Sequence, residues 1–241
     1  MKTLTYDFHI HSCLSPCGED EMTPANIIGM AQLIGLDVIA LTDHNTCKNC
    51  KSTMHFGKEA GIIVIPGMEL TTLEEVHVIC LFPCIEDAMA FDAYVYSHLI
   101  KIKNQEKIFG NQFQMNESDQ IIATEPFLLI NATDIPFSET FSLVKQYHGI
   151  MFPAHIDKNA NSLLSNLGFI PEDSSFTCVE LKDIKKLHAL KKEHPYLNHC
   201  RVLTNSDAHG LMQLNEAVAT IHVKDDSLKE ILNALELPLT T

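Results

Sequence analysis

The sequence predicts an α/β fold in which buried parallel strands alternate with helices. Two observations carry this prediction: short apolar runs recur along the 241 residues, and segments with helix-start and helix-stop residues lie between them. A third observation is that histidines and carboxylates directly follow several of the apolar runs. In a barrel of βα units the carboxyl ends of the strands gather on one face, where active sites lie. We therefore expect these polar residues to converge.

The first strand is expected over about residues 3–10, and it ends in two histidines. Because alternate residues of a strand point the same way, His9 and His11 project from one face, with Asp7 behind them. Two imidazoles side by side at a strand end are a natural half of a metal site.

The later strands are short, and capping residues delimit the helices between them. Seven or eight strands are expected, and those after the first lie at about residues 37–41, 62–65, 76–82, 150–154, 177–181, 201–204 and 217–223. Helices are expected from Thr23-Pro24 to Gly35, up to about Gly61, from Ser138 to Gly149, from about Ile184, and after Ser227. Threonine and serine are favourable N-caps, and glycine ends helices in a left-handed conformation.

The stretch 85–149 interrupts this rhythm. Residues 85–107 are expected to form one or two helices, and residues 110–125 a hairpin or an excursion. We interpret 85–149 as a helical and irregular insertion, or a lid, within a single domain that spans residues 1–241.

The charge of the chain restricts its partners. The formal net charge is −14, from 17 basic and 31 acidic residues, so a basic face that grips long duplex nucleic acid is not expected. No apolar run is long enough to predict a membrane span, and the first residues lack the apolar core of a signal peptide. We expect a cytoplasmic protein, in which the eight cysteines are mostly reduced thiols or ligands.

The residues with metal-ligand chemistry share one position in the predicted topology. They lie at, or just beyond, the ends of strands far apart in the sequence: His11, His44, Glu69, His155 and Asp207. Imidazoles and carboxylates in this number could hold two or three divalent cations, and such ligands favour zinc, manganese or iron. Two metals about 3.5–4 Å apart activate a water molecule and neutralise a phosphoryl oxygen.

These residues and the motifs around them resemble the PHP domain family, whose name stands for polymerase and histidinol phosphatase. The matching motifs cover essentially the whole chain and are His9-Ile10-His11, Thr42-Asp43-His44-Asn45, Pro66-Gly67-Met68-Glu69, His77, Pro153-Ala154-His155 and Ser206-Asp207-Ala208-His209. The resemblance implies a distorted (β/α)7 TIM-like barrel with a trinuclear metal centre that hydrolyses phosphoesters.

The resemblance also implies a ligand set for each ion. The implied sets are, for the first ion, His9, His11, Glu69 and Asp207; for the second, Glu69 as a bridge with His77 and His155; and for the third, His44 and His209. Glu69, Asp207 and His209 are the residues expected to carry catalysis. The nucleophile would be a metal-bridging hydroxide, with no covalent enzyme intermediate.

One position departs from the family pattern. The family has an aspartate or a histidine five or six residues after the second histidine, where this chain has Pro16 and Cys17. A thiolate at Cys17 is a plausible zinc or iron ligand. Glu19 or Asp20 could instead reach in from the same loop, and the sequence favours neither alternative.

Two further features have a functional and a plain interpretation. Cys47 and Cys50 form a CxxC pair without a second pair at zinc-site spacing, so they are a redox pair or simply two thiols in a first helical turn. Lys158, three residues after His155, is a candidate phosphate contact or a solvated surface lysine.

Three functions remain open on these grounds. The first is a metal-dependent phosphoesterase whose substrate is a small phosphorylated molecule, a nucleotide or a nucleic-acid end. The second is an amidohydrolase-like hydrolase of a non-phosphate bond, because a metal with hydroxide also attacks carbonyls. The third is a non-catalytic, metal-stabilised interaction module. The nearly complete ligand set favours an enzyme, and a cation placed to hold phosphate oxygens would favour the first function.

Overall fold

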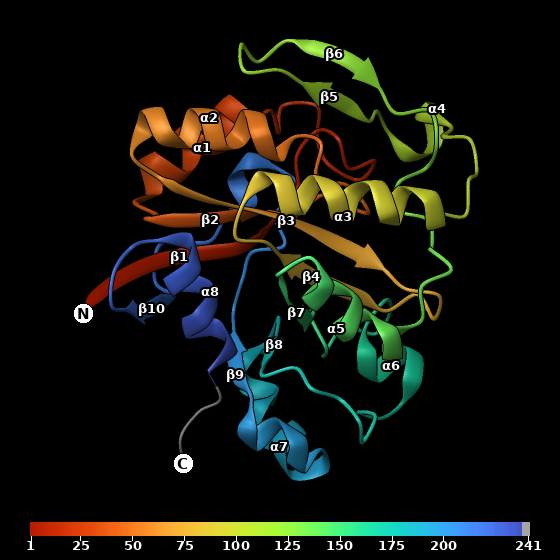
Figure 1. The fold of residues 1–241 in the computed structure, drawn as a ribbon, viewed down its shortest axis with the longest axis vertical. Coiled ribbons are helices and arrows are strands. Elements are labelled where there is room, and N and C mark those ends of the chain that lie inside the picture. Colours follow the sequence, from red (N-terminus) through yellow and green to blue (C-terminus); the bar gives the residue numbers. More distant parts are fainter. Residues whose placement is uncertain (238–241) are drawn as a thin grey trace.

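The computed structural model describes residues 1–237, which form a strongly curved sheet covered by helices (Figure 1). The strands of the main sheet are β1 (Lys2–Ile10), β2 (Val38–Leu41), β3 (Ile63–Thr71), β4 (His77–Leu81), β7 (Ile150–Pro153) and β10 (Thr220–Val223). In space they follow the order β10–β1–β2–β3–β4–β7.

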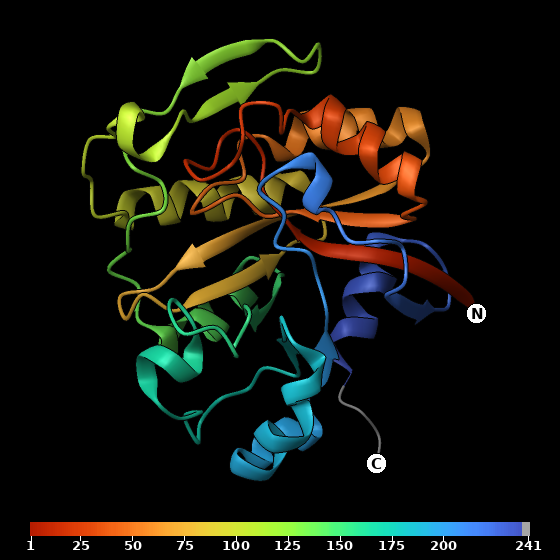
Figure 2. The same cartoon turned by 180° about the vertical axis from the view of Figure 1, so that it is seen from behind.

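Two further short strands continue the curved sheet back toward β1. These strands, β8 (Cys178–Glu180) and β9 (Arg201–Leu203), pair in parallel. A parallel bridge between Ile10 and Ala208 then joins the end of β1 to the segment that follows β9, and in Figure 2 the blue segment after β9 crosses the red strand β1. The predicted class, a distorted TIM-like α/β barrel, is confirmed.

The strands are not all parallel, and this part of the expectation was wrong. The pairs β1–β2 and β2–β3 are parallel, but β3–β4, β4–β7 and β1–β10 are antiparallel. The connection between β3 and β4 contains only residues 72–76. So short a connection can close a hairpin, whereas a parallel crossover needs a dozen residues or more.

Strand β3 is also longer than the sequence indicated, so Glu69 lies inside a strand rather than after one. The dipeptide Pro66-Gly67 looks like a strand end, but here it permits a close approach between strands. A Cβ atom on Gly67 would lie 2.8 Å from the carbonyl oxygen of Cys80 on β4. A strand glycine of this kind marks close packing of another backbone.

The longer helices cover the outside of the sheet. They are α1 (Pro24–Ile34), α2 (Cys50–Ala60), α3 (Ile85–His98), α5 (Phe137–Gln146) and α8 (Leu228–Glu236). The predicted ends of α1 are confirmed: the Thr23 side chain accepts a hydrogen bond from the backbone of Asn26, and Gly35 has φ 83°. Helix α5 follows Pro136 rather than starting after Ser138, because proline already supplies the extended residue before a helix.

The stretch 85–149 combines helices with a hairpin. Between α3 and α5 lie the single turn α4 (Glu106–Phe109) and the antiparallel strands β5 (Phe113–Met115) and β6 (Ile121–Thr124). The side-chain amide of Asn45 donates to the carbonyl of Leu129 over 2.7 Å, so this stretch borders the end of β2. That it acts as an insertion or lid remains a prediction.

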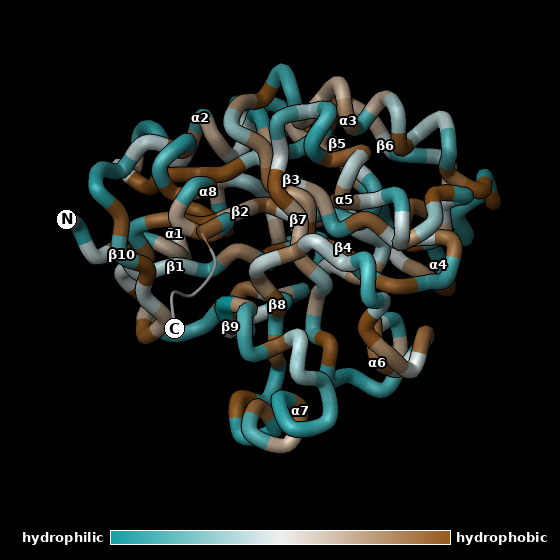
Figure 3. Tube along the Cα trace, turned by 60° about the horizontal axis from the view of Figure 1, so that its bottom comes forward, coloured by the Kyte–Doolittle hydropathy of each residue, from teal (hydrophilic) through white to brown (hydrophobic). Residues whose placement is uncertain are grey.

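The apolar core fills both faces of the curved sheet, and Figure 3 shows brown, hydrophobic residues along its central strands. Two short helices lie at the edge: α6 (Leu163–Leu167) and α7 (Leu187–Glu193). Helix α7 projects from the body in Figures 1 and 3 and contains no fully buried residue. Within residues 1–237 there is no helix with the length and apolar character that crossing a membrane requires.

Candidate metal centre

Eight side chains with metal-ligand chemistry converge at the end of β1. They are His9, His11, His44, Glu69, His77, His155, Asp207 and His209. Parallel bridges bring the segments together: Ile10 pairs with Ala208, and His44 pairs with Glu69. The convergence that strand-end placement predicted is therefore present in the structure.

The innermost group contains His9, His11, Glu69 and Asp207, whose nearest ligand atoms all lie within 4.8 Å of one another. Nε2 of His9 is 3.1 Å from Nε2 of His11. Oε2 of Glu69 lies 3.1 Å from His11 Nε2, and Oδ1 of Asp207 lies 3.3 Å from His9 Nε2. Four candidate ligands thus point toward one buried position.

A carboxylate orients His9 from behind. Nδ1 of His9 lies 3.1 and 3.0 Å from the two oxygens of Glu180, which have no proton to give, so Nδ1–H is the donor. Glu180 is itself held by the side-chain amide of Asn205 at 2.7 Å and the backbone N–H of His155 at 3.1 Å. A fixed donor at Nδ1 leaves Nε2 to face the other ligands.

A hydroxyl orients His11 in the same way. Ser15 Oγ donates to Asp43 over 2.7 Å, and it accepts from the backbone N–H of His44 over 3.2 Å. Because the hydroxyl proton is used by Asp43, His11 Nδ1 donates to Ser15 over 3.0 Å. Nε2 of His11 therefore also faces the buried position.

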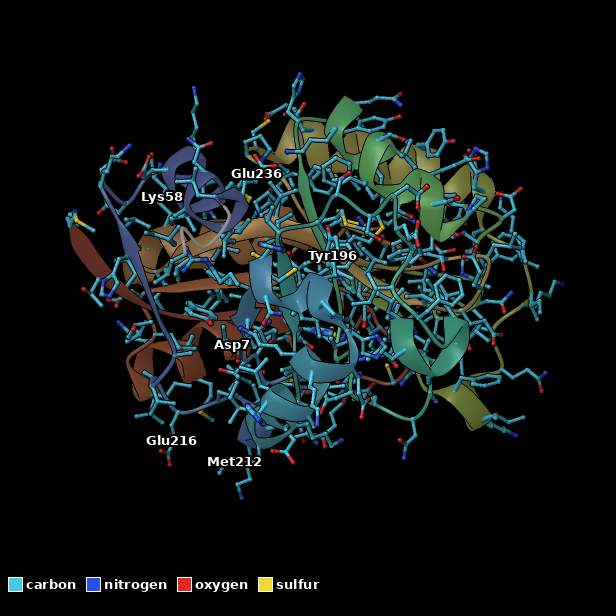
Figure 4. The ribbon with its side chains drawn as sticks, turned by 90° about the horizontal axis from the view of Figure 1, so that it is seen from below. Asp7, Lys58, Tyr196, Met212, Glu216 and Glu236 are labelled. Atoms are coloured by element: carbon cyan, nitrogen blue, oxygen red, sulfur yellow. The ribbon has the colours of Figure 1, made fainter. Side chains whose placement is uncertain are left out.

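Asp7 supports the strand that carries both histidines, and Figure 4 shows it within the protein, while Met212 and Glu216 lie at its edge. One oxygen of Asp7 accepts from the backbone N–H groups of Ser206 at 3.1 Å and His9 at 3.3 Å. Burial raises the pKa of Asp7 to about 6, and the hydrogen bonds from Ser206 oppose that rise.

The charges of this group call for a buried cation. Burial disfavours an imidazolium at His9, yet the charges of Glu180, Glu69 and Asp207 raise the pKa of His9 well above its usual value. Burial likewise opposes ionisation of Glu69, but the neighbouring histidines hold the pKa of Glu69 well below its usual range. Among residues 1–237, Glu69 Oε2 and His44 Nδ1 are buried atoms without a hydrogen-bond partner. A divalent cation would satisfy both, so these residues fit a metal site.

Glu69 is the centre of the arrangement. Its Oε1 lies 2.8 Å from Nδ1 of His77 and 3.2 Å from Nε2 of His155, and also 3.3 Å from His9. Its Oε2 lies 3.1 Å from Nδ1 of His44. One carboxylate therefore faces imidazoles on several sides, as a ligand that bridges two ions would.

The second group of ligand atoms contains His44, Glu69 and His77. The family resemblance instead implied His77 and His155 beside Glu69. His155 adjoins this group through its 3.2 Å contact with Glu69. The structure thus brings the implied residues together and places His44 with them as well.

The third group contains His11, His44 and His209. The ring of His209 stacks on that of His11 with centroids 4.2 Å apart. Burial, and then the charge of His11, lowers the pKa of His209 to about 4, which favours the neutral, metal-binding form. The His209 side chain is 26% exposed, so this group opens toward solvent.

The loop candidates for the third ion lie around this opening. Cys17 lines the pocket above the cluster and is exposed. The backbone N–H of Glu19 donates to the carbonyl of His209 over 2.8 Å. Asp20 accepts from the side chain of Asn111 over 2.9 Å. None of these three belongs to the ligand groups found within residues 1–237, and a loop ligand stays a prediction.

Lys158 lies at the rim of the cluster. Its ammonium group pairs with Oδ2 of Asp207, while Oδ1 of the same carboxylate faces the histidines. The pocket above the cluster has a volume of about 250 Å³ and is lined by Lys158, Asn161 and six of the candidate ligands. A lysine in this position can reach an anion bound at the centre.

Strained backbone supports the site. His155 and Asp207 have positive φ angles of 29° and 54°, and Asn45, beside His44, has 52°. Residues other than glycine rarely adopt a positive φ unless neighbouring contacts hold the backbone there, and such residues cluster at functional sites. The Asn45 side chain shows how it is held, since it accepts from the backbone N–H of Thr71 over 2.8 Å.

The fold and the centre together define a metal-binding α/β barrel with its ligands at the strand ends. Comparison with known proteins agrees: the model of the PHP domain family matches residues 7–232. The chain belongs to the PHP domain family, as its motifs suggested.

Two curated proteins match parts of the chain. An uncharacterized protein of Methanocaldococcus jannaschii is 36% identical over 76 residues, which are 28% of this chain and 44% of that protein. A 5′-3′ exoribonuclease of Haemophilus influenzae is 33% identical over 82 residues, 33% of this chain and 29% of the exoribonuclease. The matched segments span less than half of either relative.

Solved structures share the fold at low identity. The lesion-specific endonuclease Q of Pyrococcus furiosus has a TM-score of 0.67 and 19% identity, over 98% of this chain and 56% of its own. A candidate metal-dependent phosphoesterase of Bifidobacterium adolescentis has a TM-score of 0.61 and 18% identity, over 97% of both chains. An amidohydrolase of Chromobacterium violaceum has a TM-score of 0.56 and 14% identity, over 90% of this chain and 91% of its own.

The residues that orient the ligands were not among those predicted from the sequence. Glu180 is the last residue of β8 and so stands at a strand end like the candidates that were selected. Its position was a usable signal. Ser15 and Asn205 gave no such signal, because their roles depend on contacts with Asp43 and Glu180 that only the folded chain brings about.

The CxxC pair forms a buried part of the structure. Cys50 is the first residue of α2, and both thiols are buried and donate to the carbonyl of Gly67, at 3.1 Å from Cys47 and 3.5 Å from Cys50. Burial raises the pKa of the Cys47 thiol well above its usual value. These contacts support the interpretation as two thiols at the start of a helix.

Proposed function

We propose that the protein is a metal-dependent phosphoesterase with a multinuclear centre. The observation that carries this proposal is the placement of Glu69, whose two oxygens face five histidines at 2.8–3.3 Å. A buried carboxylate so surrounded suits a bridge between metal ions, and paired ions are the usual catalysts of phosphoester hydrolysis without a covalent intermediate.

The ligand groups support two or three divalent ions. His9, His11, Glu69 and Asp207 would hold the first. Glu69, His77 and His44 or His155 would hold the second, and His209 with His11 or His44 the third. The mixture of imidazole nitrogen and carboxylate oxygen favours zinc, manganese or iron. When bound, the ions supply an activated water nucleophile and neutralise charge on the phosphoryl group.

The residues of the chain have separate roles in this proposal. Glu69 and Asp207 keep the centre in one geometry. Lys158, next to Asp207 at the pocket rim, binds a phosphoryl oxygen that the ions do not reach. His209 is partly exposed and lies beside the pocket, where its neutral ring would hold an outer ion that stabilises the leaving oxygen.

The proposed substrate is a phosphomonoester, a nucleotide or a nucleic-acid end. The net charge of −14 disfavours a tight grip on long duplexes, and the pocket of about 250 Å³ suits a small group or a chain end. The match to a 5′-3′ exoribonuclease supports a nucleic-acid end. The eight cysteines are free thiols, which is compatible with the cytoplasm.

Hydrolysis of a carbonyl compound is the second candidate, because an amidohydrolase shares the fold. The two functions differ in what must hold the substrate. An amide is neutral and has no use for a cation at the rim, whereas a phosphate needs one. Lys158 at the rim therefore favours the phosphoesterase, and the nearly complete ligand cluster disfavours a non-catalytic module.

The test is elemental analysis of the purified protein together with phosphoester turnover. Activity is measured before chelation, after chelation, and after refilling with manganese or with zinc. We expect two or three metals per chain and activity that is lost and then restored. Bound metals with turnover of amides but not of phosphoesters would overturn the proposal, as would a protein that binds no metal.

A further inference from the structure

One residue of the stretch 85–149 reaches the pocket of the metal centre. Ile130 lines this pocket and is half-buried. Among the described residues that line the pocket, Ile130 has the one large aliphatic side chain, and the others are candidate ligands or the polar or small side chains of Lys158, Ala160 and Asn161. An aliphatic side chain on the wall of a polar pocket is costly to leave in water, and it suits contact with an apolar part of a ligand.

A tight turn carries Ile130 at its tip. The backbone N–H of Asn131 donates to the carbonyl of Leu128 over 3.2 Å, which closes the turn around Leu129 and Ile130. Leu129 is fully buried and belongs to an apolar cluster with Leu14, from the loop that follows β1. Because Leu129 anchors one side of the turn in the protein, Ile130 is left to face the pocket.

The side chain of Asn45 fastens this turn to the metal centre. Its amide nitrogen donates to the carbonyl of Leu129 over 2.7 Å and to that of Asn131 over 2.8 Å. Both amide hydrogens thus hold the residues on either side of Ile130. The amide oxygen accepts from the backbone N–H of Thr71 on β3. Asn45 is fully buried and has a φ of 52°, and a strained residue held by its own side chain in this way indicates a functional constraint.

A second buried amide supports the turn from within the stretch 85–149. Gln112 is fully buried, and its Oε1 accepts from the backbone N–H of Leu129 over 2.8 Å. Its Nε2 donates to the carbonyls of Glu125 at 2.9 Å and Phe127 at 2.8 Å. Because two buried amides hold the turn, little conformational freedom is lost when a ligand contacts Ile130.

The two sides of the pocket therefore differ in chemistry. Asn45 directly follows His44, so the turn that carries Ile130 adjoins the His44 side of the cluster. Lys158 adjoins Asp207, with which its ammonium group pairs. A phosphoryl group held on the Lys158 side would leave the organic part of the substrate beside Ile130.

We propose that Ile130 determines specificity by contacting the organic group of the phosphoester, and that Asn45 is the positioning residue that presents it. This inference rests on the proposed phosphoesterase function and narrows its substrate to phosphoesters whose organic group has an apolar face, such as an aryl ring. Short polyol phosphates are disfavoured, because hydroxyl groups that face the isoleucine lose hydrogen bonds to water.

The test compares phenyl phosphate with glycerol phosphate as substrates of the metal-loaded protein. Ile130→Ser removes the apolar contact, so the ratio of kcat/KM for phenyl phosphate to that for glycerol phosphate should fall roughly tenfold, mostly through KM. Ile130→Val keeps an aliphatic contact and should lower the ratio less. Ile122→Ser, which changes an exposed isoleucine on β6 of the same stretch, is the matched control. An unchanged ratio in Ile130→Ser, or an equal fall in Ile122→Ser, would overturn the proposal.

Asn45→Gly tests the positioning role. Glycine adopts a positive φ without strain, so this variant removes the side-chain hydrogen bonds while the backbone conformation stays accessible. A ratio that falls as in Ile130→Ser, at unchanged metal content, would show that Asn45 acts through the turn. An equal loss of kcat/KM for both substrates would show a merely structural role and overturn the positioning of Ile130 by Asn45.

Calorimetric binding of phosphonates distinguishes this inference from the proposed function. Phenylphosphonate and methylphosphonate contain a carbon–phosphorus bond in place of the ester bond, so binding to the metal-loaded protein is measured without hydrolysis. If no phosphoester is hydrolysed, the proposed function fails. A preference for phenylphosphonate that is lost in Ile130→Ser, but not in Ile122→Ser, would then retain Ile130 as the apolar contact of the pocket. A preference that is the same in both variants and the wild type would reject it.

Discussion

The two ends of the metal cluster are built differently. At the inner end, His9 and His11 are buried and each has its far nitrogen fixed by a partner, Glu180 or Ser15. At the outer end, His209 is 26% exposed, and its Nδ1 contacts Asp207, two residues away in the chain, through the backbone carbonyl at 2.9 Å and the carboxylate at 3.7 Å. Ligands held by outer partners bind metal more tightly. We therefore expect tight inner ions and a weaker, exchangeable outer ion.

Removing the central carboxylate should have the largest effect. Glu69→Gln keeps the side-chain volume but removes the charge shared by the inner groups, so turnover should fall by at least about 10³-fold. Two ions should bind more weakly, while far-ultraviolet circular dichroism stays like that of the wild type. Full activity in this variant would contradict the assignment of the centre.

Weakening the hydrogen bond between His9 and Glu180 should have an intermediate effect, and only on the ions at the inner end. Glu180→Gln can still accept from Nδ1 but makes the imidazole a poorer ligand, and we expect metal affinity to fall about 10–100-fold. Competition with a chromogenic chelator measures this change. Glu216→Gln, at the exposed edge of the molecule, is the control. Equal affinities in both variants would mean that Glu180 does not orient His9.

Changing the outer end should remove one ion and spare the others. His209→Ala is expected to lower the metal content by one ion per chain and to affect the inner ions less, because His209 belongs to the outer ligand group and not to the two inner groups. Elemental analysis after dialysis gives the count. Loss of all metals would show that the two ends are a single unit.

The smallest effect is expected at the loop. If Cys17 supplies the outer ligand, Cys17→Ser should weaken only the outer ion, by roughly tenfold or less, since its thiol is not among the described ligand groups. Matched variants Glu19→Gln and Asp20→Asn test the alternatives. The variant that alone weakens the outer ion identifies the loop ligand, and a weakened inner ion in Cys17→Ser would contradict the separation of the two ends.

The sequence predicted the parts that depend on local pattern. The alternation of β1 placed His9 and His11 together, and the caps of α1 at Thr23 and Gly35 were correct. The sequence did not predict that β4 is antiparallel to β3, because an apolar run does not indicate the direction of a strand. It also did not predict the length of β3, because Gly67 looks like a strand end but in fact allows close packing against β4.

The contacts that orient the ligands could not be derived from the sequence. Glu180 lies 171 residues from His9 in the chain, and no local spacing links the two. The same holds for Asp157, whose carboxylate accepts a hydrogen bond from the backbone N–H of Lys182 at 2.8 Å. Strand-end position predicts where a site is, whereas long-range contacts decide how firmly each ligand is held.

The most direct test of this account is a stepwise metal titration of the chelated wild-type protein with manganese, followed by chelator competition and elemental analysis. We expect at least two classes of ion: an inner class that fills first and resists the chelator, and one outer ion that is removed easily. His209→Ala should abolish only the second class. A single class of equal affinity, or inner ions that leave before the outer one, would contradict the difference between the two ends.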